Sequence, residues 1–184
     1  LIGGAFVFAS LIKLKGHRFT SESGENYPID SAWHFFETMY RSGIYWQFIG
    51  LAQLIAGFLL MTQRHAKLGA IMNFPIIANI FVVTISYHFG GTPVITGLML
   101  LANLMLRIWD WDTLKVVFNY PPKIEQKNRL QRDVIWEIVG LTLFLFTFLY
   151  LVFVNKYDMF FWFGVCLLIG SIGLFLGFKR RSRY

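Results

Sequence analysis

Three amide side chains stand near the middle of long apolar stretches in this sequence: Gln53, Asn79 and Asn103. Each lies eight or nine residues from one end of its stretch, which is roughly 12–14 Å along a helix. An unpaired amide that faces lipid costs several kcal/mol. We therefore expect all three to point into a helix bundle, near the middle of a bilayer.

Two interpretations of these amides stay open. In the first, they hydrogen-bond between helices, and each bond contributes roughly 0.6–2 kcal/mol. In the second, they form the polar floor of a cavity that could seat the head group of a quinone or of a similar lipophilic molecule. That cavity would open outward past Tyr45, Tyr87 and His88, with Lys13 near its mouth. The candidate ligand-binding residues are therefore Lys13, Gln53, Asn79, His88 and Asn103.

Catalytic and redox motifs are missing from the sequence. A single cysteine, Cys166, allows no thiol–disulfide exchange within the chain. The four histidines lie outside the apolar stretches or at the end of one, where they cannot hold a haem inside the bundle. The sequence has no phosphate-binding loop, HExxH or serine nucleophile motif. We expect no catalytic residues, no intrinsic cofactor and a non-catalytic role.

A metal site is not expected either. His17, His34, Glu37 and His88 fall on one predicted side of the membrane. Their spacing matches no known ligand pattern, so we interpret them as solvated residues at the interface.

The composition indicates which elements must position these groups. Hydrophobic residues make up 56% of the 184 residues and charged residues 15%, against about 45–50% and 25% in soluble domains. A domain of this size has too little interior for so much apolar surface. The chain is therefore predicted to be an all-α, multi-pass transmembrane bundle. Its net charge of +7 comes from residues at the ends of the apolar stretches, which indicates membrane orientation rather than nucleic-acid binding.

Five stretches approach the 17–25 residues that a spanning helix needs. They are 44–61, 68–87, 94–108, 134–154 and 159–178. The apolar residues 1–12 are interpreted as the outer part of a sixth span whose beginning is missing, because the first residue is Leu1 and not Met.

Lysine and arginine predict the orientation. Twelve of them fall on one side and five on the other, so we expect both termini in the cytoplasm. The larger group holds Arg64, Lys67, Arg107, Lys115, Lys123, Lys127, Arg129, Arg132, Lys179, Arg180, Arg181 and Arg183. The smaller group holds Lys13, Lys15, Arg18, Arg41 and Lys156.

Two connections are predicted to carry surface helices. On the outer side, Asp30 or Ser31 can cap a helix whose apolar stripe leaves His34, Glu37 and Arg41 mostly outside it. The stripe consists of Ala32, Trp33, Phe36, Met39 and Tyr40. We expect this helix to lie flat on the membrane.

On the inner side, Trp111, Leu114, Val117 and Phe118 suggest a second surface helix, which Pro121 and Pro122 would stop. The basic stretch 123–133 that follows suits anionic lipid head groups.

Small residues in the last span form a GxxxG motif at Gly173 and Gly177. Such residues let two helix backbones approach closely in lipid. The motif is interpreted either as packing within the bundle or as a homodimer contact.

Parts of the chain resemble the DoxX family of bacterial membrane proteins. Residues 2–14 are similar to that family's opening helix, which is rich in small residues and ends in a lysine, here Lys13. Residues 50–60 resemble its second helix, and 68–72 and 106–112 resemble its later ones. Gln53 stands where family members typically carry glutamate. The resemblance implies a four-helix core over residues 1–115, with the surface helix at about 30–41. A cytoplasmic connection (116–133) and two additional helices with a basic tail (134–184) would follow.

The resemblance also implies a function. The DoxX family is associated with quinone-linked and oxidative-stress redox systems. It implies a non-catalytic accessory subunit in the bacterial plasma membrane, with a redox partner protein and quinone as a candidate ligand. Two alternatives stay open: a binder or carrier of a small lipophilic molecule, and a membrane scaffold for another protein.

Overall fold

The computed structural model describes residues 2–121, 134–154 and 158–181, and all regular secondary structure in them is helical. The long helices are α3 (Ile44–Met61), α4 (Ala66–Ser86), α5 (Thr92–Trp109), α7 (Val134–Phe153) and α8 (Met159–Arg181). All five are long and apolar enough to cross a membrane. Helix α1 (Ile2–Leu14) is shorter but equally apolar. The predicted all-α bundle with several membrane-crossing helices is therefore confirmed.

Glycines set the close contact between α1 and α3. A Cβ atom on Gly57 would lie 2.9 Å from the backbone oxygen of Gly3, and one on Gly50 would lie 2.9 Å from Cβ of Lys13. Any larger residue would push the two helices apart. The two contacts also show that the helices run antiparallel, since Gly3 meets the far part of α3 and Lys13 its beginning.

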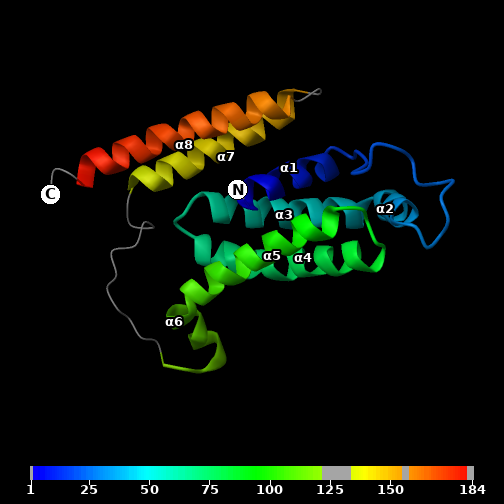
Figure 1. The fold of residues 1–184 in the computed structure, drawn as a ribbon, viewed down its shortest axis with the longest axis horizontal. Coiled ribbons are helices and arrows are strands. Elements are labelled where there is room, and N and C mark those ends of the chain that lie inside the picture. Colours follow the sequence, from blue (N-terminus) through cyan, green and yellow to red (C-terminus); the bar gives the residue numbers. More distant parts are fainter. Residues whose placement is uncertain (1, 122–133, 155–157, 182–184) are drawn as a thin grey trace.

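The other helices extend this pair on two sides. On one side, α4 packs on α3 and α5 packs on α4. On the other side, α7 packs on α1 and α3, and α8 packs on α7. The α7–α8 hairpin runs along one edge of the bundle and the α4–α5 pair along the opposite edge (Figure 1). An apolar core forms where Val7 and Leu11 of α1 meet Leu151 of α7.

The GxxxG motif of α8 is used inside the chain. A Cβ atom on Gly173 would lie 2.7 Å from Val139 of α7, and one on Gly177 would lie 3.6 Å from Trp136. This geometry corresponds to the interpretation in which the motif packs helices within one bundle.

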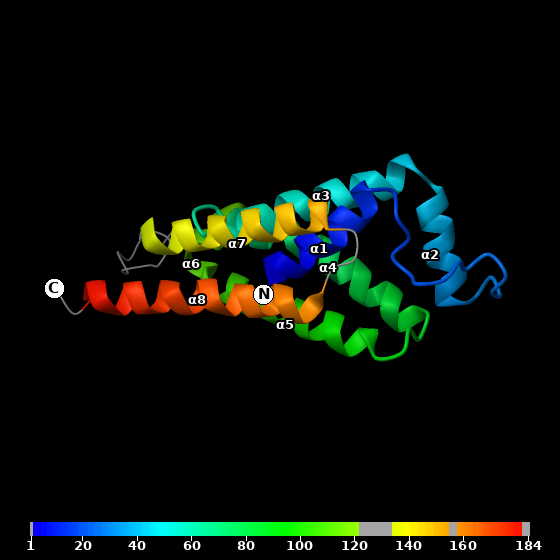
Figure 2. The ribbon, with the colours of Figure 1, turned by 90° about the horizontal axis from the view of Figure 1, so that it is seen from above.

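The helix predicted after Ser31 is α2 (Ala32–Arg41), and both the helix and its Ser31 cap are confirmed. The Ser31 side chain accepts a hydrogen bond from the backbone N–H of His34 at 3.2 Å. Helix α2 runs crosswise over one end of the bundle, beyond the start of α3 (Figure 2). We call this the cap end.

At the opposite end, α6 (Trp111–Leu114) leads into a 3₁₀ turn, η1 (Lys115–Phe118). The predicted inner helix is thus present, but its second half is tighter than an α-helix. The turn ends at Asn119, whose φ of 62° is left-handed. The predicted basic stretch 123–133 lies outside the described residues, as do Pro122, Lys156 and Arg183.

Candidate ligand-binding site

Four of the buried polar side chains come one from each of four helices. Ser10 (α1), Asn73 (α4) and Asn103 (α5) are 0% exposed, and Gln53 (α3) is 2% exposed. We call these four residues the polar layer. Gln53 and Asn103 therefore point inward, as the sequence predicts.

Contacts between neighbouring helices place the four residues at similar heights. A Cβ atom on Gly50, one turn from Gln53, would lie 3.0 Å from the backbone oxygen of Ser10. The hydroxyl oxygens of Thr84 and Thr96 are 3.0 Å apart, which sets Asn103 opposite the α4 turn that follows Asn73. At about 1.5 Å per residue, the polar layer spans roughly 8 Å along the bundle.

Seven-residue spacing of the buried residues on α3 and α5 turns Gln53 and Asn103 inward. In α3 the buried face carries Trp46, Gly50, Gln53, Gly57 and Leu60. The buried residues of α5 are Thr96 and Asn103, again seven apart. Residues at this spacing return to the same face of a helix after two turns.

Asn79 does not belong to the layer, and its predicted inward orientation is wrong. Its depth along α4 resembles that of the other amides, but its side chain is exposed. The buried face of α4 instead carries Ala70, Asn73 and Ile77. Asn79 lies six residues from Asn73, which at 100° per residue places it on another face of the helix. No sequence signal identified Asn73, because α4 is apolar on nearly all sides.

Five buried amide atoms of the layer have no hydrogen-bond partners among the described residues. They are both polar atoms of Asn73, both of Asn103 and Oε1 of Gln53. Ser10 is different, because its hydroxyl donates to the backbone oxygen of Val7 at 2.7 Å. Each buried polar group without a partner costs about 1–3 kcal/mol. The hydrogen bonds expected of interhelical packing are thus missing between these amides.

Lys13 lies at the cap-end side of the layer and is 6% exposed. Its Nζ donates to the backbone oxygen of Ala9 at 3.0 Å. The same atom lies 5.0 Å from the ring centres of both Phe19 and Trp46. The ammonium group is therefore held between two aromatic faces, an arrangement that stabilises a cation.

His88 and the predicted opening beside it are at the cap end. His88 follows α4 with a left-handed φ of 48° and is exposed. The neighbouring Tyr87 ring stacks on Phe35 of α2, with ring centres 4.8 Å apart. Phe89 contacts Trp33 of α2 edge to face, with ring centres 5.8 Å apart. Rings of α2 therefore cover this part of the cap end.

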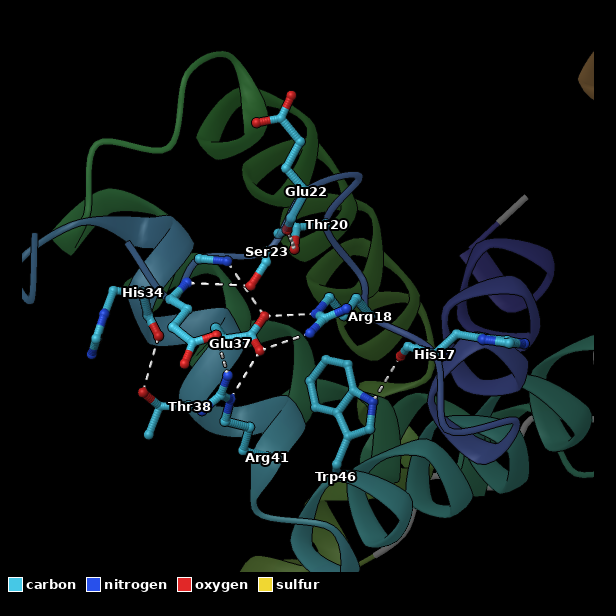
Figure 3. A network of polar contacts seen from close by, with 12 residues as sticks. His17, Arg18, Thr20, Glu22, Ser23, His34, Glu37, Thr38, Arg41 and Trp46 are labelled. Carbon is cyan, nitrogen blue, oxygen red and sulfur yellow. Dashed lines mark hydrogen bonds and ion pairs between the residues drawn. The ribbon is translucent and has the colours of Figure 1, made fainter. Parts of the chain in front are cut away.

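Glu37 of α2 is the centre of a second buried polar group (Figure 3). Arg18 donates to its carboxylate from Nε at 2.7 Å and from a terminal nitrogen at 3.1 Å. Nε of Arg41 donates at 3.0 Å and the backbone N–H of Gly24 at 3.3 Å. Arg41 also pairs with Glu25 at 2.7 Å. We call these residues the cap network.

The solvated state predicted for Glu37 is wrong, since its side chain is 3% exposed. The loop 15–31 folds over α2 and carries Arg18 and Gly24 onto the carboxylate. Hydrogen bonds from Arg18, and then from Arg41 and Gly24, lower the pKa of Glu37 to about 2. Sequence spacing gave no sign of the Arg18–Glu37 pair, because nineteen residues separate its members.

The described residues contain no group of three His, Cys, Asp or Glu side chains placed to hold a metal ion. His34 and Glu37 lie near each other in sequence, but the carboxylate is already occupied by arginine donors.

Comparisons with known proteins give one partial match. The uncharacterized protein YwoB of Bacillus subtilis (strain 168) is 34% identical over 84 residues, which are 46% of this chain and 51% of YwoB. The match thus spans about half the length of that relative. No family model and no solved structure matches the chain. The chain is similar to YwoB over this segment.

Proposed function

We propose that this chain is a non-catalytic protein of the bacterial plasma membrane that binds the polar head group of a small lipophilic molecule in the polar layer. The observation that carries this proposal is the set of five buried amide atoms without hydrogen-bond partners among the described residues. A bound head group would supply the donors and acceptors that these atoms lack.

The amides can serve both kinds of hydrogen bond. The Nδ2 groups of Asn73 and Asn103 donate, and their oxygens, together with Oε1 of Gln53, accept. A quinone head group offers carbonyl acceptors to the donors, and a hydroxyl group would satisfy the oxygens. The surrounding helices are apolar, which suits a ligand with a hydrocarbon body.

The proposed biological role is that of an accessory subunit in a membrane redox system. It rests on the resemblance of residues 1–115 to the DoxX family. The proposed role requires a redox partner protein that carries the redox centre. Co-purification from the native membrane followed by mass spectrometry should recover a stoichiometric redox enzyme, and an unrelated stoichiometric partner would contradict this role.

The proposed orientation puts both termini in the cytoplasm and α2 on the outer surface. It rests on the distribution of lysine and arginine between the two sides. A reporter that fluoresces only in the cytoplasm should be bright when fused after Tyr184. A dark fusion that is fully expressed would contradict the orientation.

The binding proposal is tested with a photoactivatable lipophile that carries a quinone head group, added to the purified chain in detergent. Asn73→Leu and Asn103→Leu should each reduce saturable labelling at least about fivefold. Asn79→Leu is the matched control, because it makes the same change at a similar depth on an exposed face. Labelling that is equal in all three variants would contradict the proposal. Thermal unfolding of each variant confirms that a loss of labelling is not a loss of fold.

A further inference from the structure

The charge of Lys13 is buried beside the polar layer and therefore bears on the charge of the ligand. Lys13 is 6% exposed, and its Cβ lies against Gly50 of α3. The Phe19 and Trp46 rings lie on the ammonium group, each with its centre 5.0 Å from Nζ. Its hydrogen bond to Ala9 uses one of the three N–H donors.

A counter-ion for this charge is missing from the described residues. Lys13 forms no ion pair among them, and the acidic groups of the cap network are engaged elsewhere. Glu37 accepts from Arg18, Arg41 and Gly24, and Glu25 pairs with Arg41. Contacts with ring faces offset only part of the unfavourable desolvation of an ammonium ion.

The buried face of α3 runs from the neighbourhood of Lys13 to Gln53 of the polar layer. Trp46, Gly50 and Gln53 share the buried face of that helix. The ammonium lies at the height of Trp46, two turns or about 10 Å from Gln53. A ligand that passes beside the close contact of Gly50 with α1 would meet a positive charge first and unpaired amides deeper in the bundle.

We infer that the ligand of the polar layer is an acidic lipophile: its anionic group binds Lys13, and a second hydrogen-bonding group farther along its body binds the amides. This inference rests on the proposed function and sharpens it. A neutral lipophile would satisfy the amides but would leave the charge of Lys13 without a counter-ion. The Phe19 ring is 42% exposed and belongs to the loop 15–31, so the acidic group reaches Lys13 by displacing this ring.

The experiment compares two probes that differ only in the acidic group. These are 12-hydroxystearic acid and 1,12-octadecanediol, each competing with the photoactivatable quinone lipophile for the purified chain in detergent. The wild type should bind the acid at least about tenfold more tightly than the diol. Lys13→Met should remove this preference by weakening the acid alone, and Lys13→Arg should retain most of it.

Each outcome has a distinct meaning. If the wild type binds the acid and the diol with equal affinity, the inference about charge is overturned. The proposed function still holds in that case if Asn103→Leu weakens the binding of both probes. A preference for the acid that survives in Lys13→Met also overturns it. If neither probe competes and the lipophile does not label the chain, both proposals fail. Should Lys13→Met not fold, Lys13→Gln replaces it, and the wild-type comparison still decides.

Discussion

Glu37 at the centre of the cap network and the amides of the polar layer are both buried, but they differ in hydrogen bonding. Glu37 is 3% exposed and receives hydrogen bonds from two arginines and one backbone N–H. Asn73 and Asn103 are 0% exposed, and none of their side-chain polar atoms has a partner among the described residues. A saturated polar cluster stabilises a fold, whereas an unsaturated one has capacity left for a ligand.

The two regions also differ in charge: the cap network is built from charged groups, whereas the polar layer is built from neutral ones. The cap network neutralises a carboxylate with the guanidinium groups of two exposed arginines at the cap end. The polar layer lies among apolar helices and contains no charge of its own, apart from Lys13 at its edge. The four predictions below test whether the first region is structural and the second is a binding region.

The largest effect is expected from Glu37→Gln. The variant loses the charge that holds Arg18 and Arg41 over α2 and should lower the free energy of unfolding by about 2–3 kcal/mol. Thermal or denaturant unfolding in detergent measures this. Glu25→Gln is the control, because it removes an exposed partner of Arg41 and should change stability much less. If both variants lost the same free energy of unfolding, the buried Glu37 would contribute no more to stability than the exposed Glu25.

The pH dependence of the cap network follows from the lowered pKa of Glu37. Its carboxyl has a pKa of about 2 in the folded protein against an ordinary value of 4.5. A lowered pKa adds stability above pH 4.5, and that contribution is lost as the pH falls toward 2. The wild-type unfolding temperature should therefore fall more steeply between pH 4.5 and 2 than that of Glu37→Gln. Parallel curves would be inconsistent with the cap network.

In the polar layer, Asn103→Leu should have the opposite effect on stability in the absence of ligand. Removing two buried polar atoms without partners should leave stability unchanged or raise it by up to about 1–3 kcal/mol. Added lipophile should stabilise the wild type but not this variant. A clear loss of stability in ligand-free Asn103→Leu would show that the amide is already hydrogen-bonded within the bundle.

The smallest effect is expected where the two regions meet. Trp46 Nε1 donates to the backbone oxygen of His17 at 3.1 Å and so joins α3 to the loop after α1. Trp46→Phe keeps an aromatic face near Lys13 but removes this bond, and it should cost about 0.5–1.5 kcal/mol. Denaturant unfolding of the variant measures the change. A loss as large as that of Glu37→Gln would mean that the two regions do not act separately.

Sequence reasoning predicted the helices well because each leaves a local signal. The span 44–61 matches α3 at both ends, and α2 begins after Ser31 as its capping side chain indicates. The ends of α4 and α5 differ by one or two residues, where helix ends are least defined.

The orientation of side chains around a helix was harder to predict. The depth of a side chain in the bundle follows from counting residues along its own helix. Which face of that helix is buried depends on the neighbouring helices. Helix α4 is apolar on nearly all sides, so no polar stripe distinguished Asn73 from Asn79. The Arg18–Glu37 pair depends on how a loop folds over α2, which no local pattern encodes.

An experimental map of the chain, extracted from its native membrane in mild detergent, tests the central claim most directly. The account predicts non-protein density inside the bundle, within hydrogen-bonding distance of the Asn73 and Asn103 amides. Direct hydrogen bonds between the amides of the polar layer, or a layer filled only by ordered water, would contradict it.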